Sequence, residues 1–184
     1  MKALLFNPYR RIAGAGALLI GLAAMALSAV VAYFGRCHFD GVLDLHLSVL
    51  SYPLWVYFAE GLFAWLAVTL VFYVTALICA GTKVRFIDIA GTMAMSRWPM
   101  LLAAILSLLP VNRSLQLDTM TLVITLIMLV FSIWMVALMY QAYTVSAHLS
   151  GAKGTWSFII ALVVAELLSK LIATQLASIY TLNF

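Results

Sequence analysis

Long apolar runs constrain this chain more than any other feature of its sequence. Four of them are clear, at about residues 12–34, 54–80, 119–145 and 156–182. Each is long enough to cross a hydrocarbon core of about 30 Å as a helix, and none shows the apolar stripe of a soluble amphipathic helix. Hydrophobic residues make up 66% of the chain and charged residues 9%, which excludes an ordinary soluble domain. We therefore expect an all-α integral membrane protein whose solvent is the lipid bilayer.

A third span, between the second and fourth apolar runs, is less clear. The apolar segment from Pro99 to Leu109 forms only about 17 Å of helix, too little to cross the bilayer. We expect this span to cover residues 87–109, passing Arg97 and a kink at Pro99, which membrane helices tolerate when neighbours bond the freed carbonyl. An interfacial helix followed by a re-entrant segment is the alternative. The sequence thus predicts one transmembrane domain, residues 1–184, with five spans.

The positions of Lys and Arg predict the orientation of the bundle. Three gaps that share one side carry most of the basic residues: Lys2, Arg10, Arg11, Lys83, Arg85 and Lys153. The opposite side has Arg36 and Arg113, diluted by Asp40, Asp44 and Asp118. By the positive-inside rule the N-terminus is cytoplasmic and the C-terminus external. Topology also accounts for the net charge of +4, so we expect no nucleic-acid partner.

Small residues recur at helical spacing on the first span. They are Ala17, Gly21, Ala24 and Ser28. Such a stripe lets another membrane helix approach closely, although Ala and Gly are also common in membrane helices in general.

Two charged residues lie one helical turn apart inside the fifth span. Glu166 falls near mid-membrane, about 15 Å from the cytoplasmic end, and Lys170 lies about 6 Å further out. Arg97 on the third span has a similar depth. Because unpaired ions are costly there, we predict a buried cluster in which Glu166 takes charge from Arg97 and Lys170. This cluster is either a structural lock between the two spans or a midplane site for a proton or substrate.

Glu60, in the outer third of the second span, is a possible second carboxylate. It either pairs with Lys170, whose long side chain can reach outward, or lies at the wet rim of the membrane near an aromatic belt.

The first external loop concentrates potential metal ligands. Five occur within ten residues: Cys37, His38, Asp40, Asp44 and His46. Cys, His and carboxylate side chains can form a tetrahedral zinc site, but the run has neither CxxC spacing nor an HExxH helix. The alternative is a loop held by Asp–Arg or Asp–backbone bonds. Cys37 and Cys79 lie at opposite ends of the path across the membrane, so we expect free thiols.

Several segments together resemble the bacterial branch of the Yip family, the Ypt/Rab-interacting integral membrane proteins. The resemblance covers nearly the whole chain and rests on Phe6–Pro8, His38–His46, Arg85–Asp88, Ser96–Pro99, Tyr140–Tyr143, Val145–Ser146, Lys153–Phe158 and Ala165–Lys170. It implies five membrane helices, a cytoplasmic N-terminus and a bacterial inner-membrane location. Eukaryotic relatives act with small GTPases through a long N-terminal region. Only about eleven residues precede the first span here, so that partner is not carried over.

These patterns favour a non-enzymatic membrane protein without a cofactor that binds other membrane proteins or itself, or organises lipid. The alternative is a small permease, channel or lipid-translocating protein that uses Arg97, Glu166 and Lys170. A membrane metalloenzyme at the His38–His46 loop is the third hypothesis. No nucleotide-binding, hydrolase or kinase motif occurs in the sequence.

Overall fold

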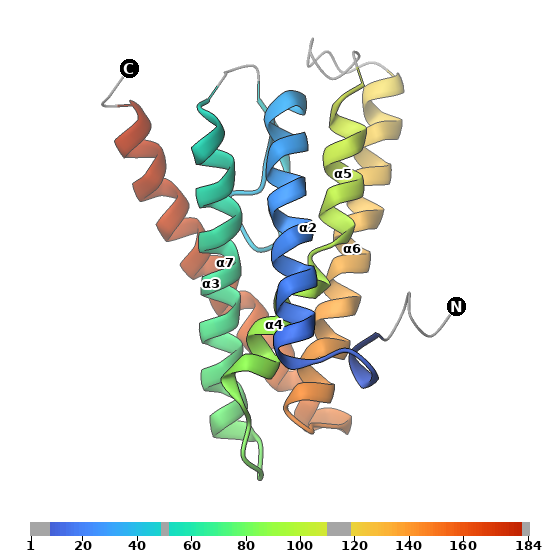
Figure 1. The fold of residues 1–184 in the computed structure, drawn as a ribbon, viewed down its shortest axis with the longest axis vertical. Coiled ribbons are helices and arrows are strands. Elements are labelled where there is room, and N and C mark those ends of the chain that lie inside the picture. The colour runs from blue at the N-terminus through green and yellow to red at the C-terminus, as the bar shows by residue number, and fades with distance from the viewer. Residues whose placement is uncertain (1–7, 49–51, 110–118, 182–184) are drawn as a thin grey trace.

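A computed structural model describes residues 8–48, 52–109 and 119–181, with residues 10 and 177–181 described through their backbone alone. Its helices run alternately up and down (Figure 1). The elements are η1 (Pro8–Arg10), α2 (Gly14–Gly35), β1 (Cys37–His38), β2 (His46–Leu47), α3 (Leu54–Cys79), α4 (Phe86–Ser96), α5 (Pro99–Ser107), α6 (Thr119–Ser146) and α7 (Gly151–Thr181). Within the described chain, five helical segments are long and apolar enough to cross a membrane. The predicted all-α class and its five spans are confirmed.

The third span is a single crossing made of two helices. α4 ends at Ser96 and α5 begins at Pro99, which occupies the first position of its helix, where its missing N–H is not needed. Across the break the backbone makes tighter bonds between residues three apart, such as Arg97 N to Ala94 O at 3.2 Å. The predicted path past Arg97 and Pro99 is confirmed, and the helix breaks at Arg97 and Trp98, just before the proline.

α4 is the centre of the bundle. Every residue from Ile89 to Arg97 is buried, although this span has the lowest mean hydropathy of the five. α4 packs directly on α2 through two glycines. A Cβ atom added at Gly21 of α2 would collide with the backbone of Ala94 in α4, and one added at Gly91 of α4 would collide with the backbone of Gly14 in α2. The close approach predicted from the small residues of the first span is therefore confirmed for α2 and α4.

The outer helices present apolar side chains to their surroundings. α6 exposes large hydrophobic residues such as Leu126, Val130 and Ile133 along its length. Its inner side meets the start of α5, where the rings of Trp98 and Trp134 lie edge to face with centroids 4.6 Å apart. A helix exposed in this way is suited to lipid rather than to water.

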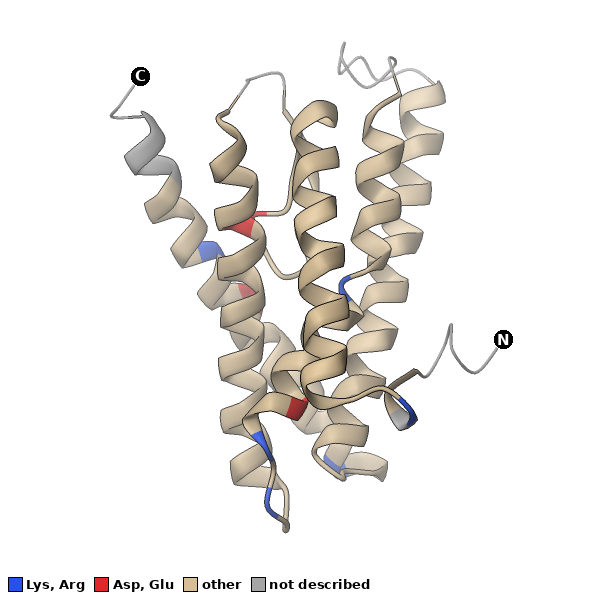
Figure 2. Cartoon of the chain, viewed as in Figure 1, with Lys and Arg blue, Asp and Glu red and all other residues tan. Residues whose placement is uncertain are grey.

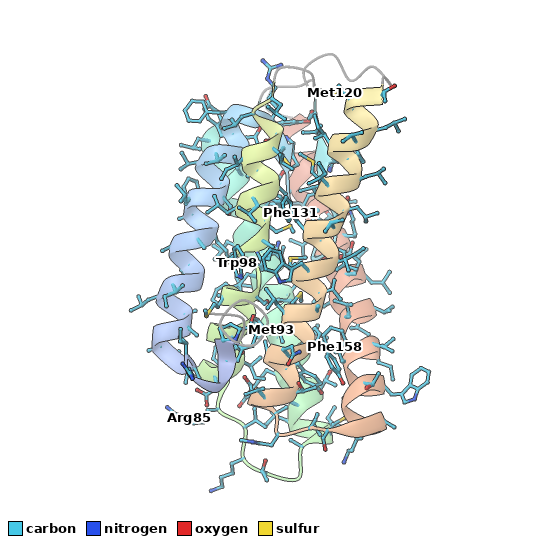
Figure 3. All side chains as sticks on the ribbon, turned by 90° about the vertical axis from the view of Figure 1, so that its right-hand side faces the viewer. Arg85, Met93, Trp98, Met120, Phe131 and Phe158 are labelled. Carbon is cyan, nitrogen blue, oxygen red and sulfur yellow. The ribbon has the colours of Figure 1, made fainter. Side chains whose placement is uncertain are left out.

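Basic residues gather at one end of the bundle. Three chain segments meet there: the stretch before α2, the connection from α3 to α4, and the start of α7, with Lys and Arg on each (Figure 2). Arg85 marks this end and Met120 the opposite one (Figure 3). Lys2, Arg113 and Asp118, which also entered the orientation argument, lie outside the described residues, as do Phe6 and Asn7 of the Yip-like segments.

Candidate functional site

The connection from α2 to α3 turns back into the bundle instead of crossing its surface (Figure 1). We call residues 36–48 the buried loop. Arg36 adopts a left-handed conformation with φ 53°, which ends α2 and reverses the chain. A two-residue antiparallel ladder then pairs Cys37 with Leu47 and His38 with His46. Cys37, His38 and Phe39 are all buried, so this connection folds into the bundle instead of lying open at its end.

α7 holds the buried loop by hydrogen bonds to its backbone. The Val42 N–H donates to Ser169 Oγ at 3.1 Å, and the Leu43 N–H donates to Glu166 Oε2 at 2.9 Å. A Cβ atom at Gly41 would lie 3.0 Å from Glu166 Oε1, so a side chain at this position would crowd the carboxylate. These bonds satisfy loop N–H groups that have no helical partner, which is a requirement at this depth.

Ion pairs reinforce the same contact between α7 and the buried loop. Lys170 Nζ pairs closely with Asp44 and lies 3.5 Å from Asp40 Oδ1. Asp40 Oδ1 is also 3.5 Å from Nδ1 of His46. One lysine and one histidine therefore share two carboxylates on the loop.

α3 holds the other side of the buried loop through His38. Its Nδ1 lies 2.9 Å and 3.1 Å from the two carboxylate oxygens of Glu60. The imidazole also stacks on Tyr57, with ring centroids 4.6 Å apart. The side chains of His38 and Glu60 are only 4% and 8% exposed, so this is a buried pair.

The surroundings of the loop shift the protonation of its side chains. Burial works to raise the pKa of Asp40, but a hydrogen bond from His46 and the charges of His46 and Lys170 outweigh it and lower that pKa. The same hydrogen bond raises the pKa of His46 above its ordinary value. Burial, assisted by the charge of Glu60, raises the pKa of the Cys37 thiol to about 12.

These contacts correct three sequence predictions. Lys170 pairs with Asp44 and Asp40, not with Glu166. Glu60 pairs with His38 inside the protein, neither with Lys170 nor at a wet rim. The aspartates of the loop pair with a lysine in place of the expected arginine, while Asp40 also has the expected backbone hydrogen bond. In each case the reason is that the loop folds inward and brings its own charges to α3 and α7.

Arg97 occupies a different place from the loop contacts. It is 4% exposed at the break between α4 and α5, and its Nη1 has no hydrogen-bond partner in the described part of the chain. Glu166 attracts it electrostatically, but no salt bridge joins the two among the described residues. The three predicted residues are thus neighbours rather than one ion-paired cluster.

Two hollows adjoin these polar groups. A cavity of about 120 Å³, the polar cavity, is lined by His38, Asp40, His46, Ser48, Tyr52, Glu60, Ala173 and Leu176. A much smaller hollow of about 20 Å³ is lined by Arg97 together with Met25, Ser28, Ala29, Phe39, Tyr57, Gly61 and Met100. The second is just large enough for one water molecule.

Comparison of the chain with family models, curated proteins and solved structures finds no match. The class of the protein is therefore inferred from its own apolar helices. The chain is a multi-pass membrane protein.

Two residues that hold the buried loop are not marked as such by the sequence. Ser169 and Tyr57 look like ordinary helix residues, yet one bonds the buried loop and the other stacks on His38. The loop sequence does indicate partial burial, because apolar Phe39 and Val42 are interspersed among its polar residues.

Proposed function

We propose that the chain is a non-enzymatic membrane protein that docks a transmembrane helix of another membrane protein between α2 and α3. The supporting observation is an apolar groove of about 250 Å³ between these helices, with buried Arg97 near its base. The groove is lined by Leu22, Met25, Ala26, Ala29, Tyr57, Phe58, Ala59, Gly61 and Leu62.

The lining of the groove suits a helix rather than a loosely held lipid tail. Ala26, Ala29, Ala59 and Gly61 are small, and small residues let helix backbones approach closely in membranes. A Cβ atom at Gly61 would meet nothing within 4 Å, so the space there is open. In the absence of a hydrophobic force between membrane helices, such close packing supplies the attraction.

Arg97 gives the groove a chemical preference. The small hollow that contains Arg97 shares Met25, Ala29, Tyr57 and Gly61 with the groove, so the two spaces adjoin. A buried N–H without a partner is costly, and an acceptor on a partner helix would satisfy it. We therefore expect the partner helix to present small residues and one carboxylate, amide or hydroxyl group.

The resemblance to the Yip family fits this proposal without deciding it. Two of the segments that carry the resemblance, His38–His46 and Ala165–Lys170, contact each other through Leu43 and Glu166 and through Asp44 and Lys170. A cytoplasmic N-terminus and a bacterial inner-membrane location belong to the same proposal.

Site-specific photocrosslinking in native membranes tests the docking. A photoreactive residue at Leu62, in the groove, should capture one membrane protein, while the same residue at exposed Leu19 on α2 should not. Gly61→Leu should abolish the product by filling the groove. Gly16→Leu is the matched control, because an added Cβ there also meets nothing within 4 Å. Products with lipid or a second copy alone, or a product unaffected by Gly61→Leu, would refute the proposal.

A small permease is the second candidate, and the helix break at Arg97 favours it. Broken membrane helices with a charged residue at the break recur at transporter substrate sites. Cysteine substitutions along α4 and α5, labelled from either side of a proteoliposome, decide between the two. Labelling at Ser96 or Met100 by a water-soluble reagent indicates an aqueous path. Its absence, together with partner capture at Leu62, indicates docking.

A further inference from the structure

The polar cavity gathers imidazole and carboxylate groups that the proposed docking does not use. Four of its lining residues are His38, Asp40, His46 and Glu60. We propose that the polar cavity binds a divalent transition-metal ion through His38, Asp40 and His46, with Glu60 orienting His38 from behind. The site lies between α3 and α7 and is separate from the groove between α2 and α3.

The contact of His38 with Glu60 prepares the other ring nitrogen for a metal. A carboxylate accepts hydrogen bonds, so the Nδ1–H of His38 donates to Glu60, which leaves Nε2 as the ring nitrogen that can bind a metal. That Nε2 is buried and has no hydrogen-bond partner in the described residues. A histidine whose second nitrogen is held by a carboxylate is the usual arrangement around protein-bound metals.

Asp40 supplies a second buried ligand atom. Its Oδ1 is buried, and its contacts to Lys170 Nζ and His46 Nδ1 are both long, at 3.5 Å. In a tetrahedral site with bonds of about 2.1 Å, neighbouring ligand atoms are roughly 3.4 Å apart. The spacing of His46 Nδ1 and Asp40 Oδ1 already matches that value.

His46 completes the set and can adjust to an ion. Its side chain is 48% exposed, and its ring stacks parallel to that of His38, with centroids 5.4 Å apart. The ligand atoms of Asp40, Asp44 and His46 already lie within 4.8 Å of one another, and a rotation of the half-exposed His46 ring is the movement that the ion would require to bring His38 Nε2 into the set. The fourth position around the ion is left to water, for which the cavity has room.

Lys170 sets the strength of the site. Its ammonium group pairs most closely with Asp44, so an ion at Asp40 leaves that pair in place. The positive charge nevertheless repels a second cation and weakens its binding. Two imidazoles and one carboxylate favour zinc, nickel or copper over magnesium and calcium, which prefer oxygen ligands.

Calorimetry with zinc on detergent-purified protein, stripped with a chelator, tests the site. One equivalent should bind to the unmodified chain. Asp40→Asn and His46→Ala should lose measurable binding, and Glu60→Gln should weaken it by about 10-fold. His148→Asn is the control, because His148 lies in the connection from α6 to α7 and Asn tolerates its positive φ, and it should leave binding unchanged.

Two further readouts separate the site from general loss of structure. Lys170→Met should tighten zinc binding, which a damaged fold would not do. Cobalt should give the visible absorption of a tetrahedral complex in the unmodified chain and in His148→Asn, but not in His46→Ala. Absence of binding, equal binding by Asp40→Asn, or weaker binding by Lys170→Met would each overturn the proposal.

Discussion

The buried loop and Arg97 are both polar regions inside an apolar bundle, but the charged side chains of the loop have charged partners within the protein, whereas Arg97 has no salt bridge among the described residues. In the loop, His38 meets Glu60, and the backbone of Leu43 meets Glu166. At Arg97 one guanidinium nitrogen has no partner among the described residues. Protein interiors pair almost all buried polar groups. The difference teaches that the paired groups of the loop hold the fold, whereas the nitrogens left unpartnered in the described chain, Nη1 of Arg97 and Nε2 of His38, are where outside groups are expected to act.

The largest expected effect comes from breaking the buried pair on the loop side of this comparison. Glu60→Leu should lower the free energy of unfolding by roughly 3 kcal/mol, because it leaves the Nδ1–H of His38 buried without an acceptor. Unfolding by denaturing detergent, followed by circular dichroism, measures it. Glu60→Gln keeps an acceptor oxygen and should cost clearly less. Equal losses for Leu and Gln would mean that the pair does not hold the loop.

Removing the contact from α7 should have the next largest effect. Glu166→Leu should cost roughly 1 kcal/mol, since the Leu43 N–H loses its acceptor. Glu166→Gln can still accept that bond and is the matched control. The same unfolding assay applies. A neutral Glu166→Leu would show that water or another group replaces the carboxylate.

Replacing Arg97 should affect stability much less than replacing the residues that hold the loop. Arg97→Met should change the free energy of unfolding by less than about 1 kcal/mol, or increase it, because an incompletely paired buried charge is replaced by an apolar side chain of similar length. Partner capture at Leu62 should fall at the same time. A loss of stability as large as that of Glu60→Leu would place Arg97 with the structural contacts and remove the contrast.

Cysteine reactivity reports whether the buried loop is closed. At about pH 8 a maleimide should label Cys79, which is partly exposed, and spare Cys37, which is fully buried. The thiolate is the reactive form, and because the pKa of Cys37 is about 12, its reactivity should appear only as the pH approaches that value. Mass spectrometry of labelled peptides measures both sites. Glu60→Leu should expose Cys37, and rapid labelling of Cys37 in the unmodified chain would contradict the closed loop.

The smallest expected effect on stability comes from the half-exposed ion pairs of Lys170 with the loop. Lys170→Met should cost only about 0–1 kcal/mol, because its side chain is 39% exposed and the polar cavity beside Asp40 has room for water in its absence. High salt should reduce the cost further. A decrease in the free energy of unfolding above about 2 kcal/mol would show that this ion pair is shielded from water and stabilises the fold as much as a buried pair does.

The helices were predictable from the sequence because each depends on a long local run of apolar residues. The break in the third span was also predictable, since Pro99 and the length of the apolar segment locate it within two residues. Arg97 was expected inside the membrane and is buried there.

The partners of the charged residues were not predictable in the same way. Lys170 was assigned to Glu166, one turn away on its own helix, but its partners Asp40 and Asp44 lie more than 120 residues away along the chain. The sequence of the loop does not by itself predict that the loop folds inward, because its path depends on the space left between α3 and α7. Loop contacts of this kind are fixed by tertiary packing.

The contact of α2 with α4 has a consequence for how the protein is made. The third span is the least hydrophobic of the five and lies at the centre, with Gly21 and Gly91 in close backbone contact with their neighbours. A weakly hydrophobic span enters the bilayer poorly by itself. During synthesis, α2 therefore has to remain near the insertion machinery until α4 emerges and docks on it. Gly21→Leu should then act before the protein is complete, as a defect in the insertion of the third span.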